Sequence, residues 1–271
     1  MQFSRTLSII LGSAILSACA HSVHDYEFAP DPNKDLGLLW VKHAAEYQAI
    51  SAQTYADARR DLAALIADSR WTALPGEQVD PTLPPAVILD IDETVVSNVD
   101  FQLTFERPFA NHKLDTWSSS VDSTPVRGVV EFVAAAREAG VTVFFVTNRP
   151  CQPIAGNPSS CPQKQTTIDD VHELGIDVDP EFVMLADERP EWDREKLSRR
   201  KHVAKTHRVI MVIGDDLSDF IPCVREKPAG HCDVAGTRAS RLRDIERYKD
   251  YWGNGWYILP NPMHGSWTSV E

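Results

Sequence analysis

Two aspartates, Asp90 and Asp92, follow directly after an apolar run at residues 86–89. The run has the length and the β-branched content of a strand that is buried on both faces. Residues i and i+2 of a strand share a face, so both carboxylates would meet at its carboxyl end, where open α/β sheets form their ligand crevice. Carboxylates this close repel each other, and Mg²⁺ would relieve the repulsion because it prefers oxygen ligands. Taken alone, however, the pair is better explained by a strand end followed by a helix start.

A second polar group, Thr147, Asn148 and Arg149, follows another apolar run at residues 141–146. A hydroxyl, an amide and a guanidinium at the end of a strand are donors suited to phosphate oxygens. Taken alone, a polar turn before Pro150 is the simpler explanation of these residues.

A third group, Asp215, Asp216 and Asp219, follows an apolar run at residues 209–213, and Gly214 permits close backbone approach there. Strands alternate with helical segments along the chain, which predicts an α/β fold: a Rossmann-like parallel sheet with helices on both faces. The carboxyl ends of its strands share one edge, so all three polar groups would converge there. This coincidence carries more weight than any single group.

The elements that position these groups can be predicted from periodicity and from Gly and Pro. Residues 38–68 repeat apolar residues at helical spacing without Gly or Pro, which predicts one long amphipathic helix or two collinear ones. The segment at about 98–125 lacks strong periodicity, and we expect it to form a small cap over the ligand crevice. A basic helix is predicted at 193–206, and a solvated face would explain most of its charges, including Arg199 and Arg200. The other predicted elements are helices at 127–139 and 164–174 and strands at 141–146, 181–185 and 209–213.

The composition bounds the organisation and the partners of the chain. With 271 residues, of which 43% are hydrophobic, it is long enough for one sizeable core. We expect a single domain at 36–271 that includes an N-terminal helical extension at 36–72. The net charge of −12 argues against a nucleic-acid polymer as partner, and an anionic substrate would have to be attracted by a few locally placed cations.

Residues 1–18 have the features of a signal peptide, because a short apolar segment at 7–16 follows a basic residue. At the end of this segment, Leu16-Ser17-Ala18-Cys19 resembles the lipobox of bacterial lipoproteins, in which the cysteine is acylated. An ordinary secretory signal with a chance cysteine is the alternative. Ala20 favours, by the same resemblance, the outer membrane of an exported lipoprotein, with 19–35 as a lipid-anchored tether.

Four further cysteines, Cys151, Cys161, Cys223 and Cys232, should be oxidised in an exported protein. Three connectivities are possible, and the local pairs Cys151–Cys161 and Cys223–Cys232 are the simplest. A zinc site is the alternative, but no Cys-x-x-Cys spacing supports it.

The ordered motifs resemble those of the haloacid dehalogenase (HAD) superfamily. They are Asp90-x-Asp92-x-Thr94, then Thr147-Asn148-Arg149, then Lys196, then Gly214-Asp215-Asp216-x-x-Asp219. The first two resemble most closely the class C (subfamily IIIB) bacterial acid phosphatases, which include outer-membrane lipoproteins with 5′-nucleotidase activity. The likeness extends to residues 45–55 and 259–267.

The resemblance implies a role for each motif residue. Asp90 would attack phosphorus and form an aspartyl-phosphate, and Asp92 would protonate the leaving alkoxide and later deprotonate water. Mg²⁺ would be held by Asp90, Asp215 and the main-chain carbonyl of Asp92. Lys196, Thr147 and Asn148 would hold phosphate oxygens. Thr94, Asp216 and Asp219 would not contact the substrate but would orient water and Lys196.

The resemblance also indicates residues that bind the leaving group. Phe101 and Trp117 would form an aromatic slot, although packing within the cap explains them equally well. His264 stands where nucleotide-hydrolysing members carry a tyrosine that stacks on the base. Arg149 is the guanidinium expected at the substrate, whereas Arg199 and Arg200 would cover the helix or pair with acids.

Together these features predict a magnesium-dependent acid phosphatase that hydrolyses small-molecule phosphate monoesters, with nucleoside 5′-monophosphates as one class. A phosphatase fold that binds a ligand without catalysis is the alternative, and a homodimer is left open. The acids, Thr147 and Lys196 are all in place, which favours the enzyme.

Overall fold

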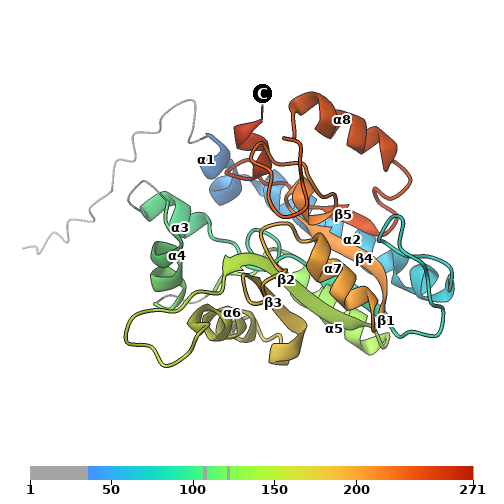
Figure 1. The fold of residues 1–271 in the computed structure, drawn as a ribbon, viewed down its shortest axis with the longest axis horizontal. Coiled ribbons are helices and arrows are strands. Elements are labelled where there is room, and N and C mark those ends of the chain that lie inside the picture. The colour runs from blue at the N-terminus through green and yellow to red at the C-terminus, as the bar shows by residue number, and fades with distance from the viewer. Residues whose placement is uncertain (1–35, 106–108, 121–122, 271) are drawn as a thin grey trace, which may run out of the picture.

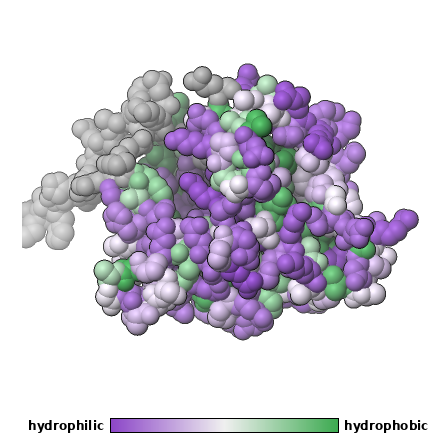
Figure 2. Space-filling model, viewed as in Figure 1, coloured by the Kyte–Doolittle hydropathy of each residue, from purple (hydrophilic) through white to green (hydrophobic). Residues whose placement is uncertain are grey.

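The computed structural model describes residues 36–105, 109–120 and 123–270 (Figure 1). The predicted signal peptide, the acylated Cys19 and the tether lie outside these residues. Within them, none of the helices is both long and apolar enough to span a bilayer. The face shown in Figure 2 is mainly hydrophilic, in line with a chain that is 24% charged.

Five parallel strands form the sheet: β1 (Pro85–Leu89), β2 (Thr142–Pro150), β3 (Val183–Ala186), β4 (Arg208–Gly214) and β5 (Trp256–Ile258). Their order is β3-β2-β1-β4-β5. Central β1 has four buried residues of five, which explains its uninterrupted apolar run. Leu89 at its end pairs with Phe145 of β2 and Ile213 of β4, so the segments that follow these strands emerge at one edge.

Helices cover both faces of the sheet. In Figure 1 the helix at 197–204 lies in front of the strands and the one at 129–138 behind them. The helices of the described residues are α1 (Leu36–His43), α2 (Ala45–Ala67), α3 (Val99–Thr104), α4 (Asn111–Ser118), α5 (Val129–Glu138), α6 (Pro162–Glu173), α7 (Leu197–Ala204) and α8 (Arg238–Arg247), with 3-10 turns at Pro180–Phe182, Leu217–Asp219 and Ser266–Ser269.

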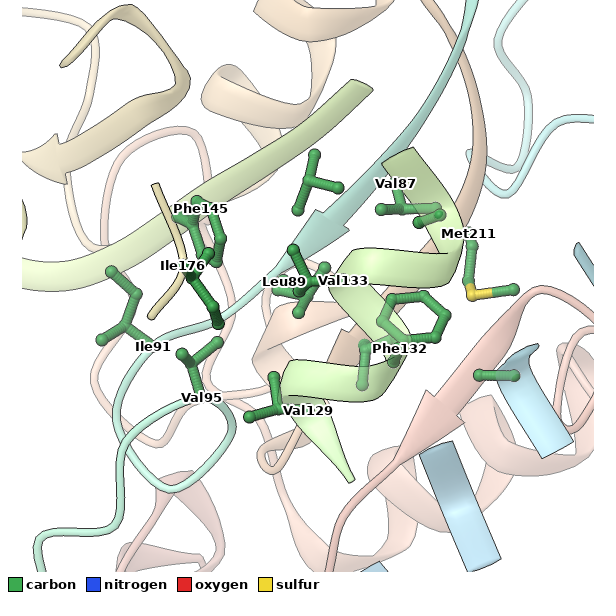
Figure 3. Packing of buried hydrophobic residues seen from close by; sticks show 14 of the residues in the cluster. Val87, Leu89, Ile91, Val95, Val129, Phe132, Val133, Phe145, Ile176 and Met211 are labelled. Carbon is green, nitrogen blue, oxygen red and sulfur yellow. The ribbon is translucent and has the colours of Figure 1, made fainter. Parts of the chain in front are cut away.

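Strand β1 divides its side chains between two hydrophobic cores, because successive residues point to opposite faces. Val87 and Leu89 belong to the core that Phe132 of α5 fills (Figure 3). Ile88 belongs to the core on the other face, with Val203 of α7. The predicted parallel sheet with helices on both faces is therefore confirmed.

Two elements, α8 and β5, were not predicted, whereas the segments at 38–68 and about 98–125 form helices within the bounds of the prediction. The helical segment at 38–68 consists of α1 and α2, which meet at Ala44, where the backbone is extended. Helix α8 and strand β5 were not predicted, since α8 has no buried residue and β5 has three residues. Helices α3 and α4 occupy the segment expected to be a cap, and Figure 1 shows them beyond the carboxyl end of β2.

Candidate active site

A cavity of about 380 Å³ opens at the carboxyl edge of the sheet. The segments after β1, β2 and β4, the loop before α7, the cap and the C-terminal segment all contribute to its wall. The predicted site residues among its lining are Asp90, Asp92, Asn148, Arg149, Lys196, Asp215, Asp216, Asp219 and His264. The three polar groups therefore converge as the sheet topology requires.

The ammonium of Lys196 lies between two carboxylates at the centre of this cavity. Its Nζ is 2.5 Å from Oδ1 of Asp90 and 2.7 Å from Oδ1 of Asp219, and its side chain is only 4% exposed. Burial opposes the charge of Lys196, but Asp219 and Asp90 outweigh burial and raise its pKa. Burial raises the pKa of Asp90 to about 7 in spite of Lys196. The pair thus places the carboxyl group of Asp90 next to a buried cation.

Three aspartates, Asp90, Asp215 and Asp219, present oxygen atoms that all lie within 4.8 Å of one another. Burial, and then the charges of Asp219 and Asp90, raise the pKa of Asp215 well above its usual range. Thr94 Oγ1 donates to Oδ1 of Asp215 at 3.1 Å and Asn261 Nδ2 to Oδ2 at 2.7 Å, which fixes its orientation. Lys196 is the one cation that pairs with these three carboxyl groups among the described residues, so net negative charge is left on a set of hard oxygen donors, which fits a divalent cation such as Mg²⁺.

The carboxylate of Asp92 is held apart from this triad by Arg149. Arg149 donates to Oδ1 of Asp92 from Nη2 at 2.8 Å and from Nε at 3.1 Å, and Asn98 Nδ2 donates to the same oxygen at 2.8 Å. Burial alone would raise the pKa of Asp92, but the charge of Arg149 outweighs it and the pKa lies below its ordinary value. On its other side, Arg149 bonds Asp170 of α6. Its guanidinium, predicted to meet the substrate, is thus already engaged by two acids.

Thr147 and Asn148 are placed differently from one another. Thr147 is fully buried, and its hydroxyl donates to Oδ2 of Asp92 at 3.3 Å instead of facing the cavity. Asn148 lines the cavity, and its Oδ1 accepts a bond from Nη2 of Arg199 at 2.7 Å. The carboxamide NH₂ of Asn148 is therefore the group of these two residues that can donate a hydrogen bond to a ligand in the cavity. Thr147 instead helps to hold the carboxylate of Asp92.

The prediction of a solvated basic face at 193–206 is wrong for Arg199 and Arg200. The two residues are 0% and 2% exposed, and α7 spans only Leu197–Ala204. Arg199 bonds the carbonyls of Thr147 and Asp193, and Arg200 bonds the carbonyl of Asp219. Buried guanidinium groups persist here because main-chain carbonyls of β2 and of the segments after β3 and β4 accept hydrogen bonds from them. Arg199 and Arg200 follow Lys196 by three and four residues, so all three share one helix face. This spacing could have predicted that both arginines lie on the buried side of the helix with Lys196.

The carboxylates of Asp216 and Asp219 accept hydrogen bonds that stabilise the loop after β4. Asp216 Oδ1 accepts the Ser218 amide at 2.9 Å and the Ser266 hydroxyl at 2.7 Å, which ties the C-terminal segment to this loop. Asp219 Oδ2 accepts the amide of Asp216 at 3.0 Å. A Cβ on Gly214 would lie 2.3 Å from the same oxygen, so a larger residue would displace Asp219 from Lys196.

The aromatic slot predicted from Phe101 and Trp117 is not found among the described residues. Phe101 is 1% exposed, stacks on Phe105 at 4.7 Å between ring centroids and contacts Trp117 at 5.8 Å, so it packs inside the cap. The rings that line the cavity are those of Phe109, which is 51% exposed, and His264. Packing among cap aromatics was the alternative explanation, and it prevails because the cap needs its own core.

His264 joins the C-terminal segment to the loop after β1. Its Nε2 lies 2.8 Å from Oε2 of Glu93, a carboxylate that is 1% exposed, and Oε1 of Glu93 accepts the amide of Asn98 at 2.9 Å. Burial lowers the pKa of His264, but Glu93 outweighs it and the pKa rises to about 9. The sequence offered no signal for this pair, which is separated by more than half of the chain.

Both local disulfides are confirmed: Cys151 is bonded to Cys161, and Cys223 to Cys232. The first closes the loop that follows β2, and the second closes a loop between β4 and α8. With both pairs oxidised, the zinc alternative for these cysteines has no free thiolates to use.

A carboxylate paired with a buried lysine, an acidic triad and a parallel sheet that presents them at one edge define a phosphomonoesterase of the HAD type. Residues 13–267 match the family model described as HAD superfamily, subfamily IIIB (Acid phosphatase), and the chain belongs to this family. It resembles the class C acid phosphatase from Bacillus anthracis, with 25% identity, a TM-score of 0.67 and coverage of 85% of this chain and 84% of that one. A structure of the same Bacillus enzyme with tungstate bound matches with the same values.

Proposed function

We propose that this acid phosphatase hydrolyses phosphate monoesters with the help of Mg²⁺, through an aspartyl-phosphate on Asp90. The observation that carries the proposal is the position of the Lys196 ammonium, 2.5 Å from Asp90 and beside the acidic triad. Tungstate is a tetrahedral oxyanion like phosphate, so its binding to the Bacillus enzyme supports an oxyanion site in this family.

In the first step, an oxygen of Asp90 attacks phosphorus, and the bond from phosphorus to the ester oxygen breaks. Asp92 first takes up a proton from solvent, which the charge of Arg149 opposes. It then gives this proton to the departing alkoxide, while Lys196 and the NH₂ of Asn148 hold phosphate oxygens. In the second step, Asp92 removes a proton from water, which attacks the phosphorus and releases Asp90 and inorganic phosphate. Arg149 keeps Asp92 oriented throughout, since it donates two bonds to one oxygen.

Asp90, Asp215 and the main-chain carbonyl of Asp92 would hold the cation. When bound, Mg²⁺ supplies positive charge that offsets the repulsion between carboxylate and phosphate. Asp219 is engaged by Lys196, so it serves to hold that ammonium in place.

Nucleoside 5′-monophosphates are one substrate class that the cavity favours. Its outer wall carries the rings of Phe109 and His264, and both present planar surfaces to a base. The imidazole of His264 is already paired with Glu93, so it would offer its face rather than a hydrogen bond.

A panel of monophosphates, assayed with Mg²⁺ and with a chelator, tests the proposal. We expect turnover that needs Mg²⁺ and a rise in melting temperature when Mg²⁺ is added to the wild type. Asp215→Asn should abolish both effects, and the exposed Asp250→Asn is the matched control. Full activity in the presence of the chelator would contradict the proposed role of the cation.

We further propose that the mature protein is anchored to the outer membrane through acylated Cys19. The support is the lipobox resemblance at the end of the apolar segment 7–16. Cys19→Ser should move the enzyme from the membrane fraction to the soluble fraction while phosphatase activity is retained. A Cys19→Ser protein that stays in the membrane fraction would contradict the anchor.

A further inference from the structure

A second groove of about 390 Å³ adjoins the active-site cavity, and the two share a wall. The shared residues are Arg194, Arg225, Gly265 and Ser266. Gly265 directly follows His264, whose ring lines the wall proposed above to contact the leaving group, so a group bound in the groove would lie beside that wall.

The shared wall concentrates positive charge in a protein whose net charge is −12. Arg194 is exposed and has no hydrogen bond or ion pair with an acid within the part of the chain that the structure describes. Lys227 adds a third cation, and Glu226 is the one acid among the described residues that line the groove. Burial and then the nearby Arg225 lower the pKa of Arg194, and the smaller opposing effects of Asp187 and Glu195 do not cancel them, so the two guanidinium groups repel each other.

Arg225 is fixed relative to the catalytic loop. Its Nη2 donates to Oγ of Ser218 at 2.7 Å, and the amide of Ser218 donates to Asp216, the neighbour of Asp215. Arg225 also forms a long ion pair, since its Nε is 3.8 Å from Oε1 of Glu195, whose side chain is 2% exposed. The guanidinium is thus held in position, and Glu195 offsets part of its charge.

We propose that Arg194, Arg225 and Lys227 form a second anion subsite, which binds a second phosphate group on the leaving group of the substrate. The preferred substrates would then be bisphosphates, from which Asp90 removes one phosphate while the groove holds the other. This inference rests on the proposed function of the first site. Two cations that repel each other without a ligand gain the most from a phosphate placed between them.

The test compares α,ω-alkanediol bisphosphates of increasing chain length with the corresponding monophosphates, in excess free Mg²⁺. We expect the wild type to prefer the bisphosphate in kcat/KM by roughly tenfold at one chain length, mainly through KM. Arg194→Gln should remove most of this preference. Arg243→Gln, an exposed residue of α8 with the same charge change, should retain it. Melting temperatures of both variants establish that they are folded.

Each other outcome overturns a definite part of the account. A wild type without a bisphosphate preference, or an Arg194→Gln variant that keeps it, would overturn the subsite. An equal loss in Arg194→Gln and Arg243→Gln would also overturn it, because overall charge would then explain the preference. Absence of turnover on every ester would overturn the proposed function, and with it the substrate class.

Discussion

Arg149 donates two hydrogen bonds to Asp92, from Nη2 at 2.8 Å and from Nε at 3.1 Å, and both reach the same carboxylate oxygen. The opposite edge of the guanidinium bonds Asp170 of α6, which is 2% exposed. One buried cation therefore serves two acids, one of which takes part in the proposed chemistry. Removal of the cation would leave both acids without their main partner.

We expect Arg149→Met to lower the free energy of unfolding by about 3–5 kcal/mol, because it leaves buried carboxylates unpaired. Adding Asp170→Asn to this variant should recover part of the loss, since one unpaired charge is removed. Arg59→Met, at an exposed position of α2, should change stability by less than about 0.5 kcal/mol. Urea unfolding of the oxidised proteins measures all three. A loss below about 1 kcal/mol for Arg149→Met would contradict the buried pairing.

The ion pair between His264 and Glu93 should make stability depend on pH. The pKa of His264 in the folded protein is about 9, against ~6.5 in an unfolded chain. Because the folded value is higher, the pair stabilises the fold fully below pH ~6.5, and this contribution is lost as pH rises to about 9. His264→Gln should therefore reduce stability near pH ~6 but not near pH ~10.

The size of this effect is limited by solvent, since the imidazole is 41% exposed. We expect a loss below about 1 kcal/mol, measured by urea unfolding at both pH values. His43→Gln, at an exposed position at the end of α1, is the control. A loss of equal size at both pH values would show that His264 contributes by packing instead of charge.

The two aspartates after β1 should respond differently to the same substitution. Asp92→Asn removes the proton carrier, so single-turnover phosphorylation should fall most with alkoxide leaving groups such as nucleosides. With 4-nitrophenolate, which departs without a proton, the loss should be at least roughly tenfold smaller. Rapid-quench measurement of the first step is required, because Asp92 also acts in dephosphorylation. Equal losses on both leaving groups would rule out Asp92 as the acid.

The sheet could be predicted from the sequence because its central strands are buried on both faces and read as continuous apolar runs. The carboxyl ends of β1, β2 and β4 then had to meet, and Asp90, Asn148 and Asp215 all line one cavity. Strand β5 could not be predicted, since it has three residues and its Ile258 is exposed.

Side-chain partners within the site were less accessible to sequence reasoning. Asp170 lies in α6, where nothing in the local pattern distinguishes it from the neighbouring Asp169. Its pairing with Arg149 depends on how α6 packs against α4 and β3, which places Asp170 beside the end of β2. Basic residues usually lie in solvent, and the burial of Arg199 is explained by the carbonyls of Thr147 and Asp193 and the carboxamide of Asn148, which accept its hydrogen bonds.

The most direct test of the account is to locate the phosphoryl group on the enzyme. The experiment uses Asp92→Asn protein, because its dephosphorylation should be slow. The protein is mixed with 4-nitrophenyl phosphate and Mg²⁺ and quenched in acid. Reduction with borohydride then converts an aspartyl-phosphate to homoserine. Peptide mass spectrometry should then find homoserine at position 90, and Asp90→Asn/Asp92→Asn protein should show none. Phosphorylation at another residue, or turnover in Asp90→Asn at the wild-type rate, would contradict Asp90 as the nucleophile.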